Sequence, residues 1–162
     1  MARLTRWLGA FGWRPLVDVV PGGYQVNLTK PEQRVVLDSM DELRVMMADH
    51  DPATRRLFPT AYVEDPQLDA EYQRLVGDDL RQGQLDALDV VERTIDGEVI
   101  DRAEADAWMR AINGVRLALG TRLDVSEEPP EALDADDPDL RDRIAYEVLN
   151  MLLGAFIHAL SV

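Results

Sequence analysis

Residues 101–120 read DRAEADAWMRAINGVRLALG, and this stretch is the best guide to the fold class. Asp101 is followed three residues later by Glu104, a pairing that caps the start of many helices. Apolar side chains then recur every three or four residues, so they fall on one side of a helix. They are Ala105, Trp108, Ile112, Val115 and Leu119. The stretch predicts an amphipathic helix that ends at Gly120, because glycine adopts the left-handed conformation of a helix end without strain.

Similar patterns predict helices on both sides of this stretch. Thr29-Lys30-Pro31-Glu32 has the residues of a capping box and predicts a helix over 29–48. Apolar periodicity predicts further helices over 65–80, 85–94 and 139–160. We therefore expect about five helices.

Two β-branched runs near the N-terminus predict a hairpin. Residues 16–20 and 24–28 flank Pro21-Gly22-Gly23, and such runs around a glycine turn are typical of paired strands. Residues 98–100 are a candidate for one more short strand. The predicted fold is mainly α, a helical domain of about five helices with a small N-terminal β-hairpin.

The charge is unevenly spread along the chain. There are 31 Asp and Glu against 17 Lys and Arg, a net charge of −14 in 162 residues. We expect a single domain over 1–162, in which 1–28 form a basic N-terminal segment and the hairpin. The helical body then spans 29–162 and contains an acidic loop at 124–142. This balance disfavours non-specific binding to nucleic acid, which depends on cations that neutralise phosphates.

The basic segment carries the candidate nucleic-acid contacts, since the rest of the chain is repulsive to phosphate. They are Arg3, Arg6 and Arg14. Apolar residues at helical spacing lie between these arginines. Three interpretations remain open for this segment: it docks on the core of the domain, it contacts a membrane surface, or it binds a partner.

Known catalytic patterns are missing from the sequence. The chain has no cysteine, which excludes a thiol nucleophile, a thiolate metal site and a disulfide framework. Its two histidines, His50 and His158, lie far apart, and His50 is predicted to belong to a helix end. No phosphate-binding glycine loop, dinucleotide fingerprint or nucleophile elbow occurs. We expect no enzymatic activity, no cofactor and no metal site.

The same reasoning applies to targeting and membrane segments. The longest apolar region, 148–162, is shorter than the roughly 20 residues that a membrane span needs, and it contains Asn150 and His158. No signal-peptide pattern is expected at the N-terminus. The expected location is cytoplasmic, without a membrane span.

Two sets of side chains are candidate contact sites. Asn113 and Arg116 flank the apolar stripe of the central helix, and Arg122 follows it. A partly buried arginine needs a partner, so these residues either pair with acids of the chain or line a partner groove for an acidic or backbone ligand.

The last helix has a second apolar face, which is either enclosed by the core or buried in a homodimer. Its residues are Leu149, Leu153, Phe156, Ile157 and Leu160.

Residues 107–123, AWMRAINGVRLALGTRL, resemble the most distinctive segment of an actinobacterial family catalogued as a domain of unknown function. Agreement extends to LFPTAY at 57–62, GEVID at 97–101 and DDP at 136–138. The resemblance covers roughly residues 24–160. One member of this family is described as an oxidative-stress transcription regulator.

The resemblance implies a non-enzymatic transcription regulator linked to oxidative stress. Such a protein would contact a sigma factor or an RNA polymerase subunit, and DNA as a further partner. In the described regulator the redox response is attributed to a cysteine pair, which this chain does not contain. The alternative is an adaptor linked to regulated proteolysis, because genes of the family lie beside that of a proteolysis adaptor.

Overall fold

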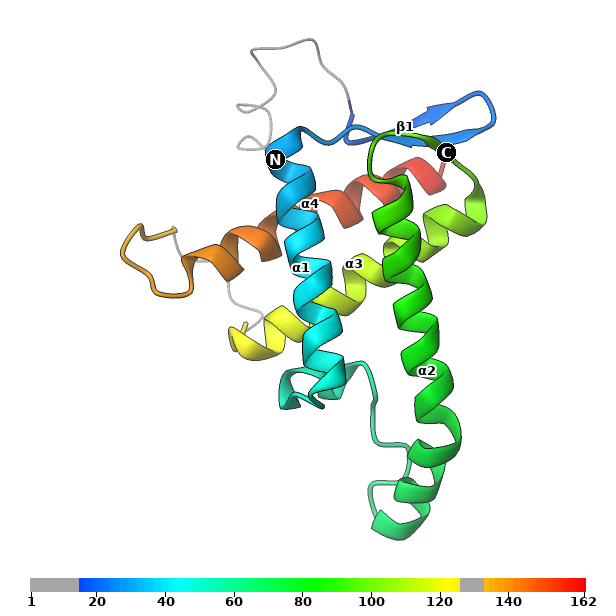
Figure 1. Ribbon diagram of the computed structural model, residues 1–162, viewed down its shortest axis with the longest axis vertical. Coiled ribbons are helices and arrows are strands. Elements are labelled where there is room, and N and C mark those ends of the chain that lie inside the picture. The colour runs from blue at the N-terminus through cyan, green and yellow to red at the C-terminus, as the bar shows by residue number, and fades with distance from the viewer. Residues whose placement is uncertain (1–14, 126–132) are drawn as a thin grey trace.

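A computed structural model describes residues 15–125 and 133–162. The candidate nucleic-acid contacts Arg3, Arg6 and Arg14 lie outside these ranges, as does the middle of the predicted acidic loop. The described part is mainly helical, as the sequence predicts, and a small antiparallel sheet lies at one end of the helices (Figure 1).

The sheet contains the predicted hairpin and one further strand. Strands β1 (Val17–Val20), β2 (Gly23–Val26) and β3 (Val99–Ile100) are antiparallel in the order β1-β2-β3. Gly23 is required where β2 meets β3, because a Cβ there would lie 2.0 Å from the carbonyl oxygen of Ile100. The candidate strand at 98–100 therefore closes the sheet beside β2 rather than standing alone.

Four α-helices and one short 3-10 helix make up the rest of the described residues. They are α1 (Lys30–Ala48), the 3-10 helix η2 (Pro52–Arg56), α2 (Pro66–Thr94), α3 (Arg102–Arg122) and α4 (Leu140–Leu160). Both predicted capping boxes are present. The Thr29 side chain accepts from Glu32 N–H, and the Asp101 side chain accepts from Glu104 N–H.

Two predicted boundaries are wrong. The predicted helices 65–80 and 85–94 are one continuous helix, α2, which passes through Gly83. A glycine in a helix costs about 1 kcal/mol relative to alanine, and burial of the following turns against α3 offsets such a cost. Gly120 does not end α3, which continues to Arg122. Gly120 is buried instead, where an added Cβ would lie 3.5 Å from the Tyr146 ring.

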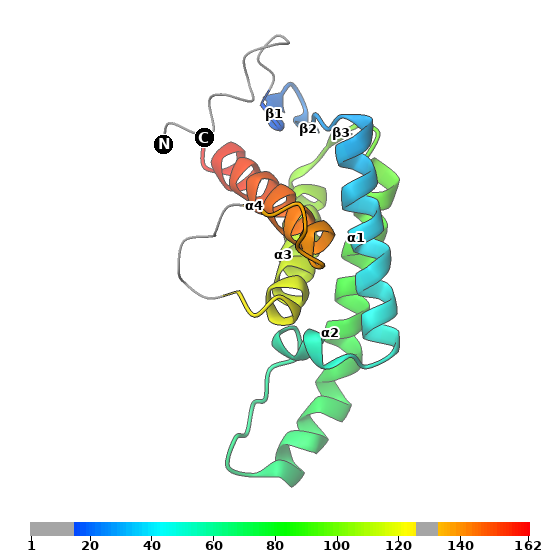
Figure 2. The ribbon, with the colours of Figure 1, turned by 90° about the vertical axis from the view of Figure 1, so that its left-hand side faces the viewer.

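Helix α3 lies at the centre of the core, between α4 on one side and α1 and α2 on the other (Figure 2). Trp108 of α3 is fully buried, and its Nε1–H donates to Thr94 Oγ1 of α2 at 2.8 Å. On the side of α4 the ring of Phe156 lies with its centroid 5.6 Å from that of Trp108. The predicted apolar stripe of residues 101–120 thus lies on α3 and packs against both α2 and α4.

The first half of α2 projects away from the body together with the loop before it (Figures 1 and 2). We call residues 57–80 the arm. The buried residues of α2 all lie between Gln84 and Thr94, so the arm contributes none of them. The loop is held to the helix by hydrogen bonds, in which Ala61 N–H and Tyr62 N–H donate to Asp69 Oδ1 at 2.7 and 3.1 Å.

Helix α4 is apolar on more than one face. By length and composition it could cross a membrane, a test that the core helices of soluble proteins also pass. Leu149, Leu152 and Phe156 are fully buried against the rest of the chain, whereas 28% of the most apolar window of the helix is buried as a whole. In contrast, Met151 and Ile157 are 45% and 51% exposed. The core therefore covers one face of α4, and apolar side chains remain on its flanks.

Candidate functional site

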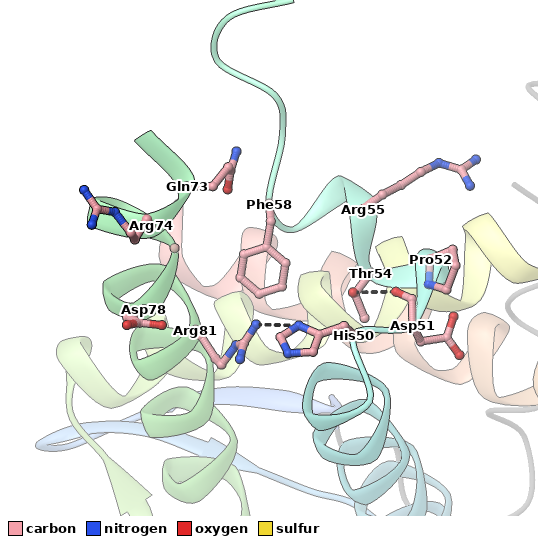
Figure 3. Close-up of a pocket in the computed structure, with 11 residues that line it drawn as sticks. His50, Asp51, Pro52, Thr54, Arg55, Phe58, Gln73, Arg74, Asp78 and Arg81 are labelled. Carbon is pink, nitrogen blue, oxygen red and sulfur yellow. Dashed lines mark hydrogen bonds between the residues drawn. The ribbon is translucent and has the colours of Figure 1, made fainter. Parts of the chain in front are cut away.

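A pocket of about 470 Å³ lies where the arm joins the body (Figure 3). Its walls come from the end of α1, from η2 and the residue Phe58 after it, and from the middle of α2. On α2 the lining residues Gln73, Gly77 and Arg81 are four residues apart, which places them on the same helix face. Segments far apart in the sequence thus meet around one cavity.

His50 reaches this pocket because α1 ends in a left-handed residue. His50 has φ of 52°, and the next residue, Asp51, donates its N–H to Met46 O at 2.9 Å. This conformation costs an L-residue roughly 1–2 kcal/mol, and glycine is the usual residue at such a position. The strain is therefore carried by a residue whose imidazole lines the pocket.

Arg81 is held between His50 and Phe58. Its Nη2 lies 3.1 Å from His50 Nδ1, and its guanidinium carbon is 5.8 Å from the centre of the Phe58 ring. Arginine has no acceptor, so Nη2 donates to Nδ1 and this contact assigns the imidazole proton to Nε2. The Nε of Arg81 is shielded from solvent and has no hydrogen-bond partner among the described residues.

Charged side chains of both signs line the pocket. Three arginines, Arg55, Arg74 and Arg81, line it with only two carboxylates, Asp51 and Asp78. Asp51 Oδ1 already accepts from Ala53 N–H at 2.8 Å. Arg74 also pairs with Glu71 at 3.9 Å, so Arg55 and Arg81 are the lining arginines that make no ion pair with a described residue.

The pocket shows no arrangement for covalent catalysis. The hydroxyl of Thr54 donates to Asp51 O at 2.7 Å, so no base in the pocket accepts its proton. Within residues 15–125 and 133–162, no three metal-binding side chains cluster together.

The arginines of the predicted partner groove are occupied by contacts within the chain. Arg116 donates to Asn150 Oδ1 and to Asn113 Oδ1, the latter at 3.2 Å, and its guanidinium carbon lies 5.7 Å from the centre of the Tyr146 ring. The structure therefore brings Asn113 and Arg116 together at the contact of α3 with α4.

Arg122 has a separate set of partners. Its Nη2 lies 2.8 Å from Glu42 and 3.0 Å from Asp142, which joins α3 to α1 and α4. This is the pairing with acids of the chain that the sequence leaves open as the structural alternative.

The candidate dimer face is only partly available on the surface. Leu149 and Phe156 are fully buried in the core of the chain itself, so the prediction is wrong for these two residues. Leu153 and Leu160 are half-buried, and Ile157 is exposed. Of the five residues of the candidate dimer face, a second copy of the chain can therefore reach only Leu153, Ile157 and Leu160.

The pocket lined by Arg55, Arg74 and Arg81, which we call the arginine pocket, was not predicted from the sequence. His50 was interpreted only as part of a helix end, and Arg81 belongs to a helix that was predicted to stop before it. The apolar cluster Leu57-Phe58-Pro59 inside a polar loop is the signal that could have drawn attention to this region. It does not show which charged residues the fold places beside it.

These features define the class: a mainly helical protein with an arginine-lined pocket and no recognisable catalytic centre in its described part. The chain belongs to the family described as "Domain of unknown function (DUF2017)", whose profile matches residues 12–160. The resemblance found in residues 107–123 is thereby confirmed.

Curated relatives carry names that describe regulators. The chain is similar to the putative oxidative stress regulator AosR of Mycobacterium leprae, with 30% identity over 128 residues, 68% of this chain and 58% of the relative. It is 26% identical to the oxidative stress regulator AosR of Mycobacterium tuberculosis over 137 residues, 71% of this chain and 63% of the relative. The chain thus spans about three fifths of the length of these relatives. No solved structure matches it.

Proposed function

We propose that this chain is a non-enzymatic regulator in the response to oxidative stress, and that it acts by binding a protein of the transcription machinery. The observation that carries the proposal is the similarity to proteins named oxidative stress regulators, which extends over 68% to 71% of the chain. A sigma factor or an RNA polymerase subunit is the proposed partner.

The shape of the molecule supports action through protein contact. The arm projects from the body and leaves Val63 82% and Leu75 66% exposed, without any partner among the described residues. Exposed apolar side chains mark a protein contact where they form a contiguous patch, and we propose that Val63 and Leu75 belong to such a patch on the arm. The arginine pocket lies at the base of this arm and offers a polar anchor beside it.

Charge favours a protein partner over DNA. A net charge of −14 opposes binding to phosphates, and DNA binding requires several cationic contacts to overcome that repulsion. The three arginines of the pocket lie beside Asp51 and Asp78 rather than on a purely basic surface. In this proposal the partner protein, rather than this chain, makes the contact with DNA.

Stress sensing is proposed to lie outside this chain. Thiol oxidation requires cysteine, and the sequence has none. In this proposal a partner detects the oxidant, and the chain changes how that partner engages the transcription machinery.

Two measurements test the proposal. The first compares transcripts of cells with and without the gene, before and after peroxide treatment. We expect a defined set of stress genes to change in the deletion strain and to recover when the gene is restored. An unchanged set would overturn the regulatory role.

The second measurement identifies the partner. The tagged chain is captured from its own host at low and at high salt, and bound proteins are identified. Recovery of a sigma factor or polymerase subunits at both salt concentrations is expected. Recovery of protease components instead would favour the adaptor function.

A further inference from the structure

We propose that the arginine pocket binds a glutamate or aspartate side chain from an acidic segment of the partner protein, with Arg81 as the main carboxylate ligand. This inference rests on the proposed function, since it assumes that the chain acts through a protein partner. It adds the chemistry of the partner and the place where it binds.

The first support is that Arg81 is positioned but not neutralised. It makes no ion pair with a described residue, whereas Arg44, Arg122 and Arg143 each pair with carboxylates of the chain. The bond to His50 and the contact with Phe58 hold its guanidinium in one orientation at the pocket (Figure 3). A fixed guanidinium loses little entropy when it binds a carboxylate through two parallel hydrogen bonds.

The second support comes from the groups around Arg81. Arg55 and Arg74 also line the pocket but direct their guanidinium groups away from Arg81 (Figure 3), whereas the tautomer of His50 leaves its Nε2–H as a further donor. The Phe58 ring and Gly77 provide apolar surface beside these donors. A glutamate side chain matches this combination, because its methylene groups are apolar and its end is a planar anion.

The balance of charge favours a carboxylate over a phosphate. Asp51 and Asp78 line the pocket beside Arg81, and Arg74 already pairs with Glu71 at 3.9 Å, so Arg81 is the cation left to bind the ligand. A monoanion matches the single charge of Arg81, whereas a phosphoryl group carries about −1.5 to −2 near neutral pH and would be repelled more strongly by Asp51 and Asp78.

The negative charge of the rest of the chain does not prevent binding of an acidic segment. At physiological ionic strength, interactions between exposed charges are largely screened beyond about 8 Å. Charges within the pocket therefore dominate the affinity, and the distant acids mainly slow the approach of the ligand. Added salt is expected to weaken binding little, unlike binding to nucleic acid.

The test uses the full chain and a fluorescein-labelled peptide in which glutamate alternates with alanine, with binding followed by fluorescence anisotropy. Two further peptides carry glutamine or phosphoserine in place of glutamate. The variants are Arg81→Gln, Arg81→Lys and the control Arg110→Gln, an exposed arginine of α3 outside the pocket. Circular dichroism checks that each variant keeps its helical content.

We expect the glutamate peptide to bind more tightly than the other two. Arg81→Gln should raise the Kd on the order of tenfold or more, because charge-assisted hydrogen bonds are lost. The Kd of Arg81→Lys should lie between those of the parent chain and Arg81→Gln, since lysine keeps the charge but not the planar fork. Arg110→Gln should leave the Kd unchanged.

Three results would overturn the inference: no binding of the glutamate peptide, equal binding by Arg81→Gln, or tighter binding of the phosphoserine peptide. If Arg81→Gln does not fold, equal affinity of Arg81→Lys and the parent chain also counts against it. These outcomes are independent of the transcript comparison. A change in stress transcripts without peptide binding would therefore retain the proposed function and reject the pocket.

Discussion

Replacing Thr94 with valine should destabilise the protein by about 1–3 kcal/mol, although the two side chains have nearly the same shape. Thr94 is 2% exposed and Trp108 is fully buried. The Thr94 hydroxyl accepts from Trp108 Nε1 at 2.8 Å and donates to Val90 O at 2.7 Å. Valine fills the same space but leaves the indole N–H buried without an acceptor, so the full desolvation penalty of that group appears in the free energy of unfolding.

The assay is urea unfolding followed by circular dichroism at 222 nm, a wavelength at which α-helices dominate the signal. Helices α1, α2, α3 and α4 make up most of the described residues, so the signal reports on unfolding of the whole core. The matched control is Thr121→Val. Among the described residues the Thr121 hydroxyl bonds only to Leu117 O of its own helix, at 2.8 Å, so its loss leaves no buried donor there. We expect the control to change stability by less than about 0.5 kcal/mol.

A double-mutant cycle separates the hydrogen bond from packing. Trp108→Phe alone loses both the N–H and part of the ring volume, whereas the double variant removes both partners of the bond. The interaction energy between the two sites should be about 0.5–3 kcal/mol. A Thr94→Val variant as stable as the parent, with no interaction energy in the cycle, would refute the role of this bond in joining α2 to α3.

Three further predictions concern α4. Gly154→Ala should raise the free energy of unfolding by about 1 kcal/mol, because a Cβ there meets nothing within 4 Å and alanine favours a helix; calorimetry measures the change, and a destabilised variant would contradict it. The hydrogen bond from Asp139 N–H, and then that from Arg143, hold the pKa of Asp137 below its ordinary value of 3.8. The ionised Asp137 carboxylate therefore contributes its full stabilisation of the fold above the ordinary pKa, and this stabilisation is lost as pH falls through the lowered pKa. Asp137→Asn should be less stable than the parent at neutral pH and equally stable in strong acid, which thermal unfolding across that pH range can check. We propose that α4 forms a homodimer through its exposed flank, and Ile157→Glu should then give a folded monomer by light scattering, whereas a monomeric parent would reject the dimer.

Local features of the fold were predictable from the sequence because local residues determine them. The capping boxes at Thr29 and Asp101 depend on side chains three residues apart, and the hairpin depends on Gly22 and Gly23 in its turn. The continuity of α2 through Gly83 was not predictable, because it depends on burial of its second half against α3. Tertiary packing there outweighs the low helix propensity of one residue.

The arginine pocket could not be predicted from the sequence for a different reason. His50 and Arg81 are 31 residues apart, and Phe58 joins them only because η2 turns the chain back toward α2. No spacing rule connects three residues on a helix end, a loop and a separate helix. The two-sided α4 shows the same limit, because its pattern indicated a second contact but did not show that Leu149 and Phe156 already meet α3.

The most distinctive segment of the family resemblance is the core helix, and this determines what that segment can transfer. Of residues 107–123, Trp108, Ile112 and Leu119 are completely or almost completely buried, so their identities are constrained by packing against α2 and α4. Relatives that keep this segment therefore keep the fold, whatever they bind. In our proposal, partner choice depends instead on exposed side chains such as those of the arginine pocket, which can change without loss of the core. A chain without cysteine can thus share the fold of named oxidative stress regulators and still take its signal from a partner, which is the arrangement that we propose here.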